Sequence, residues 1–202
     1  MMPRVLPVDD PGIDLALLEA LETSQVIIFP TETVYGIGGN PWDELILDRV
    51  RSLKERGSDQ PFTLHLADVS SIDKYAHLDA ATSRQVEQLL PGPYTLLLPA
   101  RPEAPPSAVR HGVVGIRVPD HPLFSGAISR LQRALFGTSV NRSGQPPLSD
   151  IDRIIQEFGH VDLIVTGSVR GCPSSILDLT STPVRVLRGS LPPSLNPDTE
   201  PL

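Results

Sequence analysis

Hydrophobic residues recur along this chain at two spacings, which predict alternating strands and helices. The uninterrupted apolar run at Val26–Phe29 is typical of a buried strand, and Pro30 ends it. Ahead of this run, residues 13–21 carry apolar side chains at helical spacing behind Asp10-Pro11, a helix-starting signal. The two patterns continue as far as residue 187.

The other strands and helices are predicted in the same way. Apolar or alternating runs predict strands at 62–66, 94–98, 113–118, 135–140, 162–166, 175–179 and 184–187. Helical spacing predicts helices that begin near Pro41, Thr82, Pro122 and Ser149, with Asn40 and Ser149 as caps and a capping box at 82–85.

Some connections between these strands are too short for a crossover helix. Leu179 and Val184 are separated by one tight turn, whereas parallel neighbours need a connection of about a dozen residues or more. The pattern therefore predicts an α/β fold with one mixed sheet and flanking helices. We expect one domain over residues 8–190, and we expect residues 191–202 to be a disordered, proline-rich tail.

The strand at Val26–Phe29 runs into the most distinctive stretch of the chain. Thr31-Glu32-Thr33 follows at once, and residues 36–39 include three glycines. We predict a polar turn followed by a glycine-rich loop. Because ligands bind beyond the carboxyl ends of strands in open α/β sheets, this turn is a candidate site.

Composition and charge exclude several classes of protein. Of the 202 residues, 40% are hydrophobic, enough to build a globular core, and the net charge of −7 disfavours a basic nucleic-acid coat. No apolar run is long enough to span a membrane, and residues 1–4 lack a signal-peptide core. The single cysteine, Cys172, suits a reducing compartment. A cytoplasmic protein without a structural metal site is expected.

Several polar groups stand where predicted elements end. Lys54-x-Arg56 closes a helix, Ser139-x-Asn141 closes a strand, and Arg117 lies inside an apolar strand. Taken singly, the first pair is explained by the helix dipole and the second by turn chemistry. Arg117 is harder to explain in this way, because a buried arginine needs an anion or a carbonyl as its partner.

In this order and combination, the motifs resemble those of the YrdC-type L-threonylcarbamoyladenylate synthase family. The matching segments are PTETVYGIG at 30–38, KER at 54–56, His65, PGPYT at 91–95, GIRVPDHP at 115–122, SVNRSGQPP at 139–147 and PSSILDL at 173–179. The resemblance covers residues 8–190 and corresponds to the family's single-domain form.

The resemblance implies an enzyme that condenses L-threonine, bicarbonate or CO₂, and ATP into threonylcarbamoyl-AMP and pyrophosphate. The product would serve the N6-threonylcarbamoyladenosine modification of tRNA. The implied fold is a twisted mixed sheet around a deep cavity. Mg²⁺ is expected with ATP, bound through phosphates and water, since no paired carboxylates form a cage. Transient contact with the tRNA threonylcarbamoyl transferase complex and weak tRNA binding are further expectations, with no membrane contact.

The family's pattern also implies roles for individual residues. ATP would be held by Lys54, Arg56, Gln60, Ser139, Asn141 and Arg188. Threonine would be held by Thr33, His65, Arg117 and Ser174, with Thr31 and Tyr35 lining the cavity. Lys54, Arg56 and Arg117 are the expected catalytic residues, because arginine and lysine neutralise the charges of phosphate and carboxylate groups.

Other interpretations stay open beside this one. The chain departs mildly from the family pattern, with Gly57-Ser58 after the KER motif and Gln60 where asparagine is commoner. A YciO-like paralogue shares the fold, although Thr33 and the Tyr35-Gly36 pair, intact here, tend to be absent from it. An RNA-binding or maturation module without synthase activity is disfavoured by the net charge of −7. A purely structural α/β domain would leave Arg117 unexplained.

Overall fold

A single mixed sheet runs through the molecule, and the predicted fold class is confirmed. The computed structural model describes residues 2–55, 57, 60–192 and 195. The strands are β1 (Arg4–Pro7), β2 (Ile27–Phe29), β3 (Gly36–Gly39), β4 (Thr63–His65), β5 (Tyr94–Pro99), β6 (Val109–Arg110), β7 (Val113–Arg117), β8 (Leu135–Ser139), β9 (Leu163–Thr166), β10 (Ser175–Asp178) and β11 (Arg185–Arg188). Their order is β1-β9-β2-β3-β8-β4-β7-β5-β10-β11, with β6 paired to β7. β4 is parallel to β7 and antiparallel to β8.

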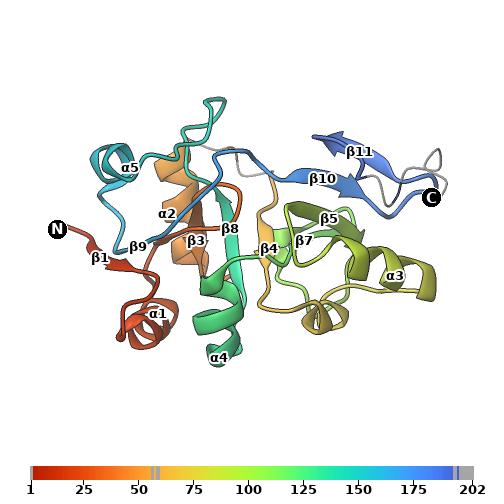
Figure 1. Ribbon diagram of the computed structural model, residues 1–202, viewed down its shortest axis with the longest axis horizontal. Coiled ribbons are helices and arrows are strands. Elements are labelled where there is room, and N and C mark those ends of the chain that lie inside the picture. Colours follow the sequence, from red (N-terminus) through yellow and green to blue (C-terminus); the bar gives the residue numbers. More distant parts are fainter. Residues whose placement is uncertain (1, 56, 58–59, 193–194, 196–202) are drawn as a thin grey trace.

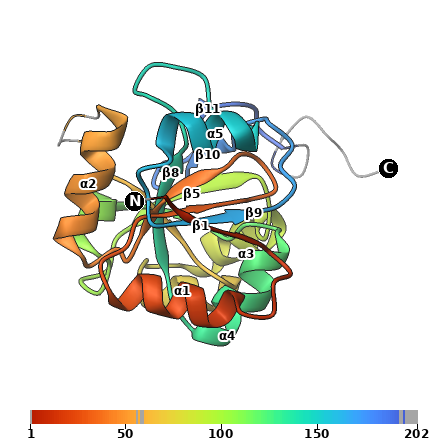
Figure 2. The ribbon, with the colours of Figure 1, turned by 90° about the vertical axis from the view of Figure 1, so that its left-hand side faces the viewer.

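The helices gather mainly on the half of the sheet that holds the N-terminus (Figure 1). They are α1 (Ile13–Glu22), α2 (Glu44–Lys54), α3 (Ala80–Leu89), α4 (Ser129–Leu131) and α5 (Ile151–Phe158), with short η1 (Val69–Lys74), η2 (Pro106–Ala108) and the π-helical η3 (Phe124–Ile128). Seen from that end, α1 and α4 lie on one side of the strands and α5 lies on the other (Figure 2). No helix of the described residues is long and apolar enough to cross a membrane.

In this half, helices cover both faces of the sheet. Along β2, Ile27 and Phe29 belong to the core cluster that includes α1 and η3. Ile28, which points to the opposite face, belongs to the cluster that includes α2 and α5. Because successive side chains of a strand point to opposite faces, an uninterrupted apolar run is what such a doubly covered strand requires.

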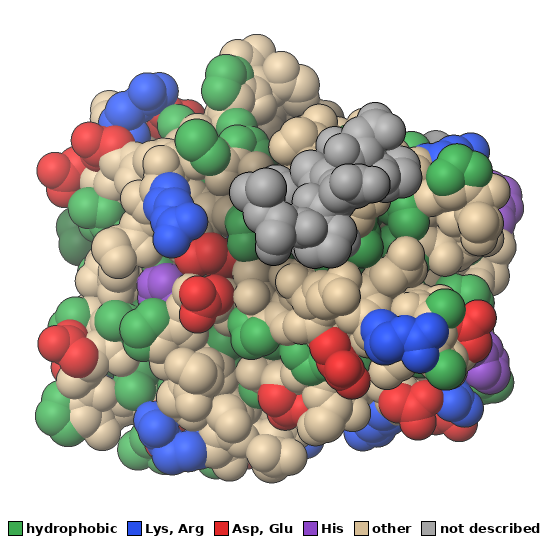
Figure 3. All heavy atoms as spheres, turned by 45° about the vertical axis from the view of Figure 1, so that its right-hand side comes forward, with side chains coloured by type: hydrophobic (Ala, Val, Ile, Leu, Met, Phe, Trp, Pro, Cys, Tyr) green, Lys and Arg blue, Asp and Glu red, His purple; other side chains and the backbone are tan. Residues whose placement is uncertain are grey.

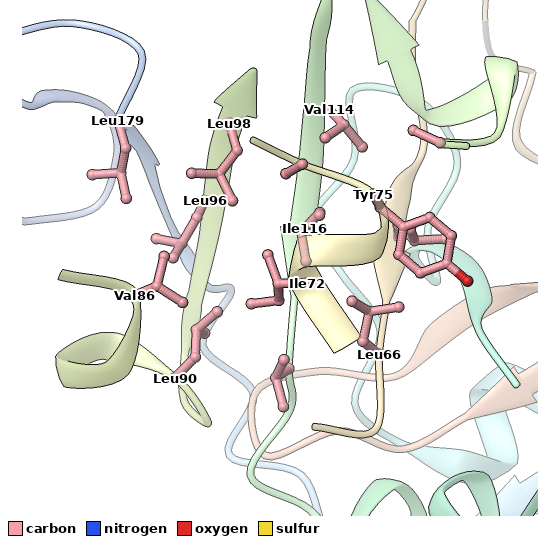
Figure 4. Packing of buried hydrophobic residues seen from close by; sticks show 14 of the residues in the cluster. Leu66, Ile72, Tyr75, Val86, Leu90, Leu96, Leu98, Val114, Ile116 and Leu179 are labelled. Carbon is pink, nitrogen blue, oxygen red and sulfur yellow. The ribbon is translucent and has the colours of Figure 1, made fainter. Parts of the chain in front are cut away.

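In the other half, helices cover only one face. Leu96 and Leu98 of β5 and Ile116 of β7 pack with residues of α3 and η1 in a third core cluster (Figure 4). The alternate residues of the same strands, Thr95 and Arg117 among them, line a cavity on the opposite face. A shift of one residue in register would exchange the two sets, so the core packing also fixes which groups face the cavity.

The glycine-rich loop that the sequence suggests is instead a central strand. β3 pairs with β2 and β8, both antiparallel. A Cβ atom on Gly38 would lie 1.8 Å from the backbone oxygen of Phe136, and one on Gly36 would lie 2.7 Å from the Phe29 ring. These glycines therefore let the β8 backbone and the Phe29 ring pack closely against β3, and they do not form a flexible loop.

Helix caps are the second correction to the sequence prediction. The side-chain caps are Asp43, Asp79 and Asp150 rather than Asn40, Thr82 and Ser149. In each case the aspartate carboxylate accepts backbone N–H groups of the first turn. A carboxylate also interacts favourably with the positive end of the helix dipole, which a neutral amide or hydroxyl does less well.

The ordered structure begins before the expected domain boundary. β1, which the sequence analysis missed, pairs in parallel with β9 and extends the sheet to Arg4. Its four residues are too few to show a clear alternation, so the pattern gave no strand signal. At the other end, Leu191 and Leu195 pack against the third core cluster. Most of the expected tail at 191–202 lies outside the described residues.

Candidate functional site

The cavity lies on the face of the sheet opposite the cluster that includes α3 and η1, and its volume is about 600 Å³. Residues of β4, β5, β7, β8, β10 and β11 line it. Its charged lining residues are Arg110, Arg117, Asp178, Arg185 and Arg188. On a chain of net charge −7, this local excess of cations indicates a site for an anionic ligand.

Arg117 occupies the most buried corner of the cavity. Its Nη2 donates to Thr33 Oγ1 at 2.6 Å and lies 2.9 Å from Glu32 Oε1. The pKa of Arg117 is lowered by burial, and the Glu32 carboxylate offsets part of that shift. Its Nε is buried without a hydrogen-bond partner among the described residues. One donor of the guanidinium is therefore left for a ligand.

The turn between β2 and β3 holds the acceptors around Arg117 in place. Thr31 Oγ1 lies 2.9 Å from Thr33 Oγ1 and donates to the Val34 carbonyl at 2.7 Å. Thr31, Glu32 and Thr33 are all buried, with exposed fractions of 8% or less. Hydroxyls that bond within a turn fix its shape, so the two threonines present Glu32 to the guanidinium.

His65 lies beside Arg117 as an uncharged group. Burial, reinforced by the positive charge of Arg117, lowers the pKa of His65 to about 3. Its Nδ1 lies 3.2 Å from the Thr63 carbonyl, and in the neutral ring this nitrogen donates, which leaves Nε2 as an acceptor. A Cβ on Gly137 would lie 2.8 Å from His65 Cε1, so a glycine there lets the ring sit against β8.

A second group of polar side chains lies across the cavity, where β10 begins. Ser174 Oγ is 3.0 Å from Thr95 Oγ1, and both residues are buried. Arg188 donates from Nε to the Ser174 carbonyl at 2.9 Å and from Nη2 to Ser174 Oγ at 3.2 Å. The pKa of Arg188 is lowered by burial and then by the positive charge of Arg117, which indicates that both cations act on the same space.

The third group joins the end of α2 to the turn after β8. Lys54 Nζ donates to the carbonyl of Ser139, and to the carbonyl and side-chain oxygens of Asn141 at 2.9 Å each. Ser139 Oγ donates to Asn141 Oδ1 at 2.6 Å. Ser139 lines the cavity directly, whereas Lys54, only 2% exposed, is occupied in holding the turn.

The structure brings most of the residues named from the sequence to one place. His65, Arg117, Ser139, Ser174 and Arg188 line the cavity. Thr33 and Thr31 lie immediately behind Arg117, and Asn141 lies behind Ser139.

Three named residues lie elsewhere or go undescribed. Gln60 is exposed near the cavity edge formed by Pro61. Tyr35 belongs to the core cluster with α2 and α5, where its hydroxyl donates to the Gly167 carbonyl at 2.6 Å. Arg56 lies outside the described residues.

Sequence reasoning missed other residues that take part in the site. Glu32 and Thr95 stand inside motifs that were recognised, PTETVYGIG and PGPYT, but neither was given a role. Asp178, which pairs with Arg185 on the cavity wall, falls within PSSILDL. The available signal for Glu32 was its place between two threonines directly after an apolar strand. A carboxylate so close to the core is expected to have a charged partner, because carboxylates are rarely buried unless they are paired.

The described part of the chain shows no preformed metal cage. Among the described residues, no three His, Cys, Asp or Glu side chains gather as metal ligands do. On the face that Figure 3 shows, acidic and basic side chains are interspersed.

Comparison with known proteins gives consistent matches over most of the chain. The sequence model of the Sua5/YciO/YrdC family, described as telomere recombination, matches residues 19–190. The threonylcarbamoyl-AMP synthase of Vibrio vulnificus is 33% identical over 171 residues, which cover 80% of this chain and 91% of the relative. That of Nitrosococcus oceani is 37% identical over 158 residues, covering 76% and 85%.

Solved structures agree with these matches. The structure of P. abyssi Sua5 complexed with L-threonine superposes with a TM-score of 0.81 and 28% identity, covering 93% of this chain. This chain spans 56% of that longer protein. E. coli YciO superposes with a TM-score of 0.82 and 26% identity, covering 92% of this chain and 93% of that one.

Proposed function

The chain belongs to the Sua5/YciO/YrdC family, and we propose that it is an L-threonylcarbamoyladenylate synthase. It condenses L-threonine, bicarbonate or CO₂, and ATP, and it releases pyrophosphate and threonylcarbamoyl-AMP. The names of the relatives and the threonine complex of P. abyssi Sua5 support this reading. The product would supply the threonylcarbamoyl group for N6-threonylcarbamoyladenosine in tRNA.

The observation that carries the proposal is the pair of arginines in one cavity. Arg117 is 5% exposed and keeps an unpartnered Nε, while Arg188 lies across the cavity on neutral partners. An amino acid and a nucleotide each bring an anionic group. Two separate cations in about 600 Å³ suit two such ligands held side by side.

Threonine is assigned to the Arg117 corner. The guanidinium binds its carboxylate, and Thr33 keeps the guanidinium in position. His65 Nε2, as an acceptor, suits the hydroxyl or amino group of the substrate, and Ser174 closes the opposite side of the pocket. Hydrogen bonds to a buried substrate hydroxyl discriminate strongly against amino acids that lack it.

ATP is assigned to the residues of the two strands that border the cavity, Ser139 of β8 and Arg188 of β11. Ser139 and Arg188 meet it directly, and Lys54 and Asn141 act through the turn that they hold. Arg56 and Gln60 are proposed to complete the nucleotide site. Mg²⁺ enters as part of the substrate, the magnesium complex of ATP, bound through phosphate oxygens and water.

The reaction needs no covalent intermediate with the protein. The ammonium group of threonine first loses a proton to water, and the resulting amine attacks the carbon of CO₂ and releases a second proton to water, which gives a carbamate. A carbamate oxygen then attacks the α-phosphorus of ATP, and the bond to the β-phosphate oxygen breaks, so that pyrophosphate leaves. Positioning and charge neutralisation in a cavity that limits water supply the catalysis.

Pyrophosphate release from the purified protein tests the proposal. With ATP, Mg²⁺ and bicarbonate, release should depend on L-threonine and should not be reproduced by L-serine or L-alanine at the same concentration. The adenylate product should appear in equal amount by mass spectrometry. Absence of threonine-dependent release from folded, ATP-binding protein would favour the YciO-like or RNA-module reading. Transient contact with the transferase complex and weak tRNA binding belong to the same proposal, and co-elution and binding assays test them.

A further inference from the structure

Two of the arginines that line the cavity, Arg117 and Arg188, differ in the charge of their partners. Arg117 is paired with a buried carboxylate, Glu32, at 2.9 Å. Arg188 bonds only to the carbonyl and hydroxyl of Ser174, and none of the ion pairs among the described residues includes it. One cation is therefore neutralised from inside the protein, whereas the other keeps its full positive charge for a ligand.

The Glu32 carboxylate interacts with Arg117 through an ion pair, and its oxygens make no hydrogen bond with good geometry among the described residues. Its side chain is 7% exposed, and both of its oxygens are buried without a hydrogen-bond partner among the described residues. Its contact with Arg117 is thus an ion pair that lacks good hydrogen-bond geometry. Burying a carboxylate so poorly satisfied costs free energy, which points to a purpose other than stability.

The groups around this pair do not cancel its effect. His65 is uncharged because burial and the charge of Arg117 lower its pKa to about 3. On the other side, Glu32 acts electrostatically on His121, whose pKa is lowered chiefly by burial. The opposite charges of Glu32 and Arg117 therefore offset one another in this corner, whereas Arg188 has no ion-pair partner among the described residues.

We propose that Glu32 sorts the two substrates between the two arginines, so that the corner of Arg117 accepts a zwitterion and rejects a polyanion. Threonine brings a carboxylate and an ammonium group, with no net charge, and is not repelled by Glu32. The triphosphate of ATP, and the pyrophosphate that leaves, carry several negative charges and gain little net attraction from an arginine whose charge Glu32 offsets, whereas Arg188 attracts them. Glu32 acts through Arg117 and by its field, and need not touch substrate. The inference rests on the proposed function only in requiring that both ligands share the cavity.

Sorting by charge has a direct consequence for ligand affinity. We would compare L-threonine with 2,3-dihydroxybutanoate, in which a hydroxyl replaces the ammonium and the net charge is −1, by calorimetry without ATP. Two charges about 6 Å apart in a partly buried site interact strongly enough for tenfold to hundredfold effects, on an order-of-magnitude estimate. The unmodified protein should therefore bind threonine at least about tenfold more tightly than the analogue.

Glu32→Gln removes the charge and keeps the shape. The preference for threonine should fall to within about threefold, and the analogue should gain affinity in absolute terms. A merely structural Glu32 would misplace Arg117 and weaken both ligands equally, so an unchanged ratio overturns the proposal. Asp178→Asn is the matched control: it removes a carboxylate from the same cavity, but one paired with Arg185. It should leave the ratio unchanged, and an equal shift in this variant also overturns the proposal.

A measurement on the unmodified protein covers the case in which Glu32→Gln does not fold. Magnesium pyrophosphate should leave the dissociation constant of threonine unchanged within about twofold, because Glu32 offsets the charge of Arg117 and the anion is drawn to Arg188 instead. Competitive displacement of threonine by pyrophosphate would overturn the proposal. Failure of threonine to bind at all would instead count against the proposed function, so the two failures are distinguishable.

Discussion

Lys54 and Arg117 are buried cations of the same site, 2% and 5% exposed, but their surroundings differ. Lys54 Nζ donates to at least three oxygens, all of them uncharged. Arg117 has two threonine hydroxyls within reach, a poorly aligned carboxylate, and an Nε without a partner. Before any ligand binds, the lysine ammonium has acceptors for its three hydrogen-bond donors, whereas the Nε donor of the arginine has none among the described residues.

The difference teaches what each cation does in the ligand-free protein. A saturated lysine shapes the backbone, here the turn after β8, where Asn141 Nδ2 also donates to the Arg142 and Gln145 carbonyls. An under-satisfied arginine next to a cavity is a binding group, because its desolvated donor recovers free energy only when an acceptor arrives. On the proposed function, we therefore expect Lys54 to act on ATP through the turn that it holds, and Arg117 to act on threonine directly.

Replacing Arg117 should produce the largest effect. In Arg117→Ala, threonine affinity should fall at least about 100-fold, because charge-assisted bonds to the carboxylate are lost. ATP affinity should stay within about threefold. The free energy of unfolding should fall by about 3–5 kcal/mol, because Glu32 is left buried without its counter-ion. Calorimetry and urea denaturation measure the two effects.

A double variant separates binding from stability at this site. Arg117→Ala combined with Glu32→Gln should recover most of the lost free energy of unfolding while threonine binding stays weak. Equal losses of threonine and ATP affinity in Arg117→Ala would contradict the assignment of Arg117 to the carboxylate.

The next effect concerns the strand that joins the two regions. β3 follows the Thr31–Thr33 turn and pairs with β8, which ends at Ser139. Gly38→Ala would place a Cβ 1.8 Å from the Phe136 backbone oxygen, and we expect a loss of about 3 kcal/mol or more by urea denaturation. Gly126→Ala, whose nearest contact would be the Arg130 side chain at 3.6 Å, should cost less than about 0.5 kcal/mol. Similar losses in both would show that β3 tolerates separation from β8.

Much of the fold was accessible from the sequence because local patterns specify it. Most strands and helices from residue 27 to 188 follow the apolar periodicity, apart from β3, β6, η1 and η2, and the short connections indicated a mixed sheet. β3 was missed because glycine carries no side-chain pattern, and its role depends on Phe136, which is distant in sequence. The helix caps were misplaced because several cap-forming residues stand close together and the choice between them depends on tertiary packing.

The sequence indicated which cations belong to the candidate site, but it did not indicate which groups each cation is paired with. Arg117 stood out as a charge in an apolar strand, and motif resemblance gave the other candidates. The pairing of Arg117 with Glu32 joins residues 85 positions apart in sequence and follows from the β2–β3 turn. Likewise, only the structure shows that Lys54 is occupied by the Ser139–Asn141 turn. Counter-ions and saturation are tertiary properties, which a linear pattern does not encode.

Removing Lys54 tests the other side of the comparison. In Lys54→Met, the Ser139 and Asn141 carbonyls lose a charged donor, and ATP affinity should fall by about 10- to 100-fold. The free energy of unfolding should fall by about 2 kcal/mol, and threonine affinity without ATP should not change. Lys54→Arg is the control that keeps the charge with a different shape. If ATP affinity survives in Lys54→Met, the lysine is a structural support of the turn and no more.

The smallest expected effect comes from His65, whose neutral state keeps the Arg117 corner from gaining positive charge. In the folded protein the pKa of His65 is about 3, below the ordinary histidine value of 6.5. Between those values the unfolded chain binds a proton that the folded protein does not, so stability falls as the pH falls below 6.5.

From pH 7 to pH 5.5 this group should cost about 1.3 kcal/mol of unfolding free energy, measured by urea denaturation at each pH. His121, whose pKa is also lowered, adds a loss of the same sign. His65→Gln should remove the His65 part of the slope. If unfolding free energy depends on pH as steeply in His65→Gln as in the unmodified protein, His65 is protonated in the folded protein as readily as in the unfolded chain. The role of His65 as a neutral hydrogen-bond acceptor beside Arg117 would then be wrong.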